Sequence, residues 1–88
     1  MRKLLDNVGS TEAISIIRTN HAVETMRSAT RRRELNDQLS NPKAGALAHL
    51  ENCRPCTLAV EARAAEFEKI SLVSLGTLTA TATATAVA

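Results

Sequence analysis

The sequence predicts a small all-α protein, a helical bundle of about three to four helices. Apolar residues recur at helical spacing in its first half, where Ile14, Ile17, Val23 and Met26 lie on one stripe. Phe67 is the chain's one aromatic residue, so the core must be aliphatic. The 88 residues make one domain at most, and so short a chain often needs a metal, a disulfide or a partner for stability.

The N-terminal half predicts a short extension followed by a long helix. Residues 1–9 form a helical turn or a frayed end that stops near Gly9. Ser10 is then expected to cap the next helix with its hydroxyl oxygen. That helix runs to about Thr30 or, through the arginines that follow, to Leu39.

The C-terminal half predicts two helices separated by a proline kink. Asn41 is a good cap directly before Pro42, whose missing N–H costs nothing in the first turn of a helix over 42–52. Pro55, within "CRPC", then interrupts the helical pattern and makes a kinked Cys-x-x-Cys junction. A last helix follows over 56–75.

The last helix has two apolar faces at helical spacing, and the tail after it is of low complexity. One face holds Leu58, Ala62 and Ala65, and the other holds Val60, Ala64 and Phe67.

The tail, residues 76–88, alternates Thr and Ala, which favours a strand beside a partner sheet and otherwise an extended or disordered segment. Residues 70–88 carry no charge, but their five threonines and two serines argue against a membrane helix.

The charge distribution argues against direct nucleic-acid binding. The net charge is +2, and residues 1–43 carry eight bases against five acids. The one dense basic run, Arg31, Arg32 and Arg33, is interpreted as a solvated helix face or as a docking site for an acidic protein surface. No aromatic residue lies near it to stack on bases.

A histidine and both cysteines of the chain lie within eight positions, as His49-x3-Cys53-x2-Cys56. Helical spacings of four and three project these side chains to one side, and thiolates with imidazole are the ligands that zinc prefers. The chain's other histidine, His21, becomes a candidate fourth ligand if its helix packs antiparallel to that of His49.

Two other interpretations of this cluster remain open, inert packing and a redox pair. A Cys-x-x-Cys pair before a helix is typical of thioredoxin-like sites, but these need a preceding β-α-β unit, and residues 1–52 predict no strand. The basic N-terminal residues are followed by Asp6 before any long apolar run, so no secretion signal is expected. Two cysteines in such a chain indicate a reducing, cytoplasmic location.

The stretch "ELNDQLSNPKAGALAHLENCRPCTLAVEARAAEF" resembles the putative zinc-finger domain of zinc-associated anti-sigma factors. The "SNP" break and the "HLENCRPC" motif carry the resemblance, which covers residues 21 to about 70. It implies that His49, Cys53 and Cys56 are three zinc ligands, and that His21 is the ligand one helix earlier. The chain departs from the family in its first twenty residues, its tail and the position of Pro55.

The resemblance implies a protein-binding regulator and no enzyme. Such proteins sequester an extracytoplasmic-function-type sigma factor by helix packing, and some release it when oxidants attack their zinc thiolates. The residues expected to contact the partner are the three arginines and the apolar residues of the last helix, namely Arg31, Arg32, Arg33, Leu58, Ala62, Phe67, Ile70 and Leu72.

The alternative interpretation is a metal-free helical structural protein of a larger assembly, such as a virion or a secretion complex, whose tail adds a strand. An enzyme lacks support, because the chain has neither a phosphate-binding glycine loop nor a convincing pair of catalytic carboxylates. Three segments are expected: an N-terminal extension over 1–9, a helical zinc-binding domain over 10–75, and the tail over 76–88.

Overall fold

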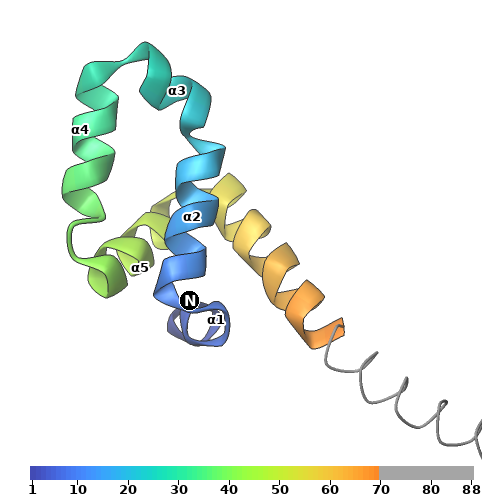
Figure 1. Cartoon of the computed structure of the whole chain (residues 1–88). Helices are drawn as coiled ribbons and strands as arrows, with labels where there is room; N and C mark the ends of the chain where they lie inside the picture. The colour runs from blue at the N-terminus through green and yellow to red at the C-terminus, as the bar shows by residue number, and fades with distance from the viewer. Residues whose placement is uncertain (70–88) are drawn as a thin grey trace, which may run out of the picture.

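The computed structural model describes residues 1–69, and over this range the fold is all-α, as predicted. Six helices and no strand lie within these residues (Figure 1). They are α1 Arg2–Val8, α2 Ser10–Asn20, α3 Ala22–Arg27, α4 Ala29–Gln38, α5 Pro42–Asn52 and a last helix over 54–69. The predictions for Ile70, Leu72 and the Thr/Ala tail lie outside the described residues.

The helix predicted from Ser10 onward is divided into three, α2, α3 and α4. It breaks at His21 and again at Ser28, whose backbone is extended at φ −134°. The hydroxyl of Ser28 accepts a hydrogen bond from the backbone N–H of Arg31 at 3.1 Å and so caps α4. The predicted Ser10 cap is wrong, because α2 begins at Ser10 itself and Gly9 takes the cap position.

The start of α5 follows the prediction, with Asn41 as cap and Pro42 in the first turn. The side-chain oxygen of Asn41 accepts from the backbone N–H of Ala44 at 3.3 Å. Gly45 is buried where α5 meets the end of α4, and a side-chain Cβ there would overlap the carbonyl oxygen of Gln38. A glycine therefore allows the close approach of the two helices.

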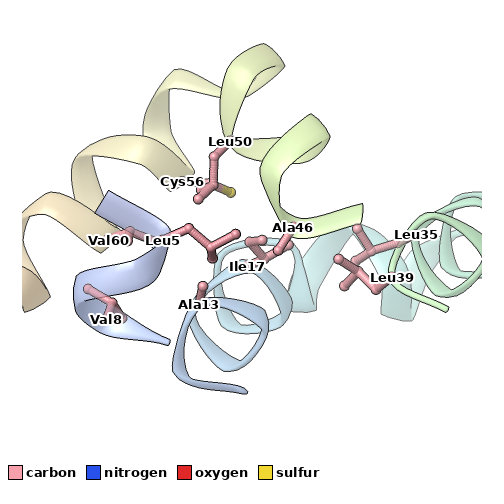
Figure 2. Close-up of a cluster of buried hydrophobic side chains, with 10 residues drawn as sticks. All are labelled: Leu5, Val8, Ala13, Ile17, Leu35, Leu39, Ala46, Leu50, Cys56 and Val60. Atoms are coloured by element: carbon pink, nitrogen blue, oxygen red, sulfur yellow. The ribbon is translucent and has the colours of Figure 1, made fainter. Parts of the chain in front are cut away.

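The core is aliphatic and gathers side chains from α1, α2, α4, α5 and the last helix. Figure 2 shows Ile17 and Ala46 near its middle, with Leu35 and Leu39 of α4 toward one end and Val60 toward the other. Its ten buried members are Leu5, Val8, Ala13, Ile17, Leu35, Leu39, Ala46, Leu50, Cys56 and Val60. Residues 1–9, expected as an extension, thus contribute Leu5 and Val8 to the same core.

Two predicted apolar positions are exposed because the break at His21 turns α3 away from the core. Val23 is 61% exposed and Met26 is 82% exposed, so the single stripe predicted through them is wrong. Within residues 1–69, α3 is the labelled helix that buries no residue at all. It packs mainly on α4, with which it forms the arch at the top of Figure 1.

The last helix turns one of its two predicted faces to the core. Val60 is buried, and Ala64 and Phe67 pack partly against the core. Leu58, 48% exposed, lies on the other face, which the rest of the described chain leaves open. No helix among residues 1–69 combines the length and the apolar character needed to cross a membrane.

Candidate metal centre

The structure brings His21, His49, Cys53 and Cys56 together at one point, where the α2–α3 junction meets the end of α5 and the start of the last helix. Their ligand atoms all lie within 4.8 Å of one another. The Nε2 atoms of the two histidines are 3.0 Å apart. The Sγ of Cys56 lies 3.3 Å from Nε2 of His49 and 3.4 Å from Nε2 of His21. These four residues lie close enough to bind a metal ion.

Three nitrogen–sulfur distances in the cluster are close to the edge of a small tetrahedron. With metal–nitrogen bonds of about 2.05 Å and metal–sulfur bonds of about 2.3 Å, such a site has nitrogen–sulfur edges of about 3.6 Å. The three nitrogen–sulfur contacts with His21 and His49 measure 3.3, 3.4 and 3.7 Å. Little movement of the side chains is therefore needed to enclose an ion.

Both imidazole rings are oriented by a hydrogen bond on the nitrogen that faces away from the cluster. Nδ1 of His21 donates to the Glu24 carboxylate at 2.8 Å, and Nδ1 of His49 donates to the side-chain oxygen of Gln38 at 2.7 Å. A metal-binding histidine in proteins almost always makes such a bond, which selects its tautomer. Each ring thus presents the unprotonated lone pair of Nε2 to the centre.

Two lone pairs that face each other at 3.0 Å repel unless a positive charge lies between them. A proton or a metal ion can supply that charge. The cluster contains two further donor atoms, the sulfurs of Cys53 and Cys56, at distances that suit the same ion. An ion that takes all four donors accounts for the whole arrangement, whereas a proton accounts only for the histidine pair.

Local structure at the proline junction places the two cysteines. Cys53 ends α5 with extended backbone and also caps the last helix, and Cys56 lies in the first turn of that helix. The hydroxyl of Thr57 donates to the backbone carbonyls of Leu50 and Cys53, which stabilises the carbonyls at the end of α5. Pro55 lies in the first turn, where its missing N–H is tolerated.

The thiol groups differ in acidity because their surroundings differ. Burial acts to raise the pKa of Cys53, but hydrogen bonds from the backbone and thiol of Cys56, together with His21, outweigh it and leave that pKa below its usual value. Burial, together with the neighbouring Cys53, raises the pKa of Cys56 to about 12. Cys53 is therefore the more acidic thiol of the pair, and a bound cation would be needed to ionise Cys56.

The histidines also differ in their tendency to take up a proton. The hydrogen bond to Glu24 raises the pKa of His21 above its usual value, against the effect of partial burial. Burial lowers the pKa of His49, and the nearby His21 and Arg31 act in the same direction. Of the two histidines, His21 therefore takes up a proton more readily.

The residues predicted to contact a partner differ in how far they are exposed. Arg32 and Arg33 are exposed on α4, whereas Arg31 is partly buried and forms ion pairs with Glu24 and Glu34. Leu58 and Ala62 are exposed on the last helix.

Phe67 is partly buried, with the guanidinium of Arg63 4.8 Å from its ring centre. Partner binding by any of these residues remains a prediction.

Sequence reasoning did not identify Glu24 and Gln38 as parts of the site. Glu24 lies three residues after His21, a spacing at which side chains meet on a helix. This spacing is the feature of the sequence that could have identified Glu24 as a partner of His21. Gln38 is eleven residues from His49 and meets it only because α4 approaches α5 at Gly45. Its role depends on tertiary packing.

Comparisons of the chain with protein-family models, with curated proteins and with solved structures find no match. The geometry of the centre is therefore the basis of the functional argument.

Proposed function

We propose that this chain is a zinc-binding regulatory protein whose metal holds the helices in place for binding to a protein partner. The observation that carries the proposal is the convergence of two imidazole nitrogens and two sulfurs within 4.8 Å, with both rings turned inward by hydrogen bonds on their outer nitrogens. Two sulfurs and two nitrogens in tetrahedral arrangement are typical of zinc.

A structural role for zinc is favoured over a catalytic one. Catalytic zinc sites have three protein ligands and keep one position for water or substrate, whereas structural sites are closed by four. Here the chain itself offers four donors, one of them the buried Cys56. Zinc thiolates of this kind persist in a reducing compartment, in line with the cytoplasmic location expected for the chain.

The partner that we propose is a sigma factor of the extracytoplasmic-function type, which the chain would sequester. Support comes from the resemblance of residues 21 to about 70 to zinc-associated anti-sigma factors and from the open face of the last helix. Leu58 and Ala62 lie on that face, and Ala62 and Ile16 line a shallow groove of about 260 Å³ between this helix and α2. An amphipathic partner helix can bind an apolar face of this kind.

Native mass spectrometry of the purified full chain tests the zinc proposal. We expect one zinc ion per chain, and its removal by a strong chelator should lower the urea midpoint of helix unfolding measured by circular dichroism. A chain that retains its helices and binds no zinc would instead favour the metal-free structural protein of an assembly.

Binding to the purified sigma factors of the host tests the proposed partner. We expect a complex with one sigma factor and reduced transcription from its promoters. Leu58→Asp should weaken that complex without loss of zinc, because Leu58 is half exposed and outside the ligand set. Glu61→Gln, an exposed change on the same helix, is the matched control. A zinc-loaded chain that binds none of these sigma factors would refute the proposed partner and leave the zinc site intact.

A further inference from the structure

The geometry points to Glu24 and Arg31 as positioning residues of the metal centre, which makes the first arginine of the basic run part of the zinc site. The inference rests on the proposed zinc site and assigns to Arg31 a role different from partner docking.

The Glu24 carboxylate bridges a metal ligand and an arginine. Its Oε2 accepts from Nδ1 of His21 at 2.8 Å, and its Oε1 accepts from Nε of Arg31 at 2.7 Å. Each carboxylate oxygen thus has its own partner, so the position of the carboxylate relative to the imidazole is fixed from both sides. Arg31 also lies 3.5 Å from the carboxylate of Glu34, which belongs to the same helix.

His21 depends on this bridge more than His49 depends on Gln38. His49 is buried in α5, where packing limits the movement of its ring. His21 lies at the break between α2 and α3, and α3 is anchored by no buried side chain among the described residues. His21 packs against the ring of His49 on its inner side, and the hydrogen bond to Glu24, with Arg31 behind it, restrains the imidazole from its outer side.

Charge supports the same assignment. A carboxylate hydrogen-bonded to the outer nitrogen of a metal-binding imidazole makes the ring a stronger ligand, and mutation of such partners typically lowers metal affinity about 10- to 100-fold. The guanidinium of Arg31 pairs with this half-exposed carboxylate and so favours the orientation that faces His21. Arg32 and Arg33, which are exposed, do not share this position.

The test measures zinc affinity of the full chain by competition with a chromophoric chelator, and the absorption spectrum of the Co²⁺-substituted protein. We expect Glu24→Ala to weaken zinc binding about 10- to 100-fold and to shift the Co²⁺ ligand-field bands. Glu24→Gln retains a side-chain oxygen acceptor and should recover part of the loss. Arg31→Ala should have an intermediate effect, which Arg31→Lys partly restores.

Two matched controls separate positioning from general effects of charge. Glu34→Ala removes the other carboxylate beside Arg31, and Arg32→Ala removes the neighbouring positive charge of the basic run. Both variants should keep a zinc affinity within about twofold of the wild type, because neither residue is hydrogen-bonded to a metal ligand or to its carboxylate partner.

Glu24→Ala with wild-type affinity and an unchanged Co²⁺ spectrum would overturn the inference while the zinc site stands. Equal losses in Arg31→Ala and Arg32→Ala would also overturn it. A wild-type chain that binds no zinc would refute the proposed function and this inference together.

Discussion

His21→Ala provides the sharpest test of the idea that a metal ion stabilises the bundle. His21 and His49 are 28 residues apart in the chain, and their ligand nitrogens meet at 3.0 Å. A metal ion that binds both closes this loop in the way a disulfide does. The spacings from His49 to Cys53 and Cys56 are local, so His21 alone makes the long-range cross-link.

The size of the effect follows from the entropy of the loop. In the chain-entropy model, closure of a loop of 28 residues contributes about 3.5 kcal/mol to the free energy of unfolding. Domains are typically stable by about 0.05–0.15 kcal/mol per residue, which gives roughly 3–10 kcal/mol for the described chain. Loss of the cross-link should therefore remove a large share of the total stability.

The effect is measured by urea unfolding of the wild type and of His21→Ala, monitored by circular dichroism. Each chain is unfolded once with zinc and once with excess chelator. We expect a difference of about 3.5 kcal/mol with zinc, which shrinks to a small remainder in chelator because neither chain is then cross-linked. Met26→Ala, 82% exposed on the neighbouring helix, is the control and should cost about 0.5 kcal/mol or less. The reasoning would be refuted if His21→Ala lowered the free energy of unfolding equally with and without zinc. It would also be refuted if the urea midpoint of the wild type did not change when chelator is added.

Three further substitutions test individual contacts. Cys56→Ser should lower zinc occupancy in native mass spectrometry more than His21→Ala does, since water can replace an imidazole more readily than a hydroxyl replaces a buried thiolate; occupancy equal to the wild type would contradict this. Gly45→Ala should cost about 1–3 kcal/mol in thermal unfolding because its Cβ overlaps the Gln38 carbonyl, and an unchanged melting temperature would count against that contact. Ser28→Ala should cost about 1 kcal/mol through loss of the α4 cap, with recovery in Ser28→Asp; equal stability of all three chains would exclude a capping role.

Much of the local structure could be predicted from residue types and spacing. Asn41 and Pro42 predicted the start of α5, because a cap and a fixed φ act within one turn. The spacing of His49, Cys53 and Cys56 predicted that the three side chains come together, but the helix break at Cys53 means that the proline junction, and not one continuous helix, sets the direction of Cys56. The division of the long helix at His21 and Ser28 was missed, and with it the exposure of Val23 and Met26.

The sequence by itself determined the helical class, the aliphatic core and the residues able to bind a metal, because these depend on side-chain chemistry and on contacts within about one turn. Tertiary structure alone decided that His21 meets His49, that Gln38 reaches the same ring, and which face of the last helix is buried. These contacts join elements far apart in the chain. Whether they form depends on how the packed helices fit, as at Gly45, and residue spacing does not contain that information.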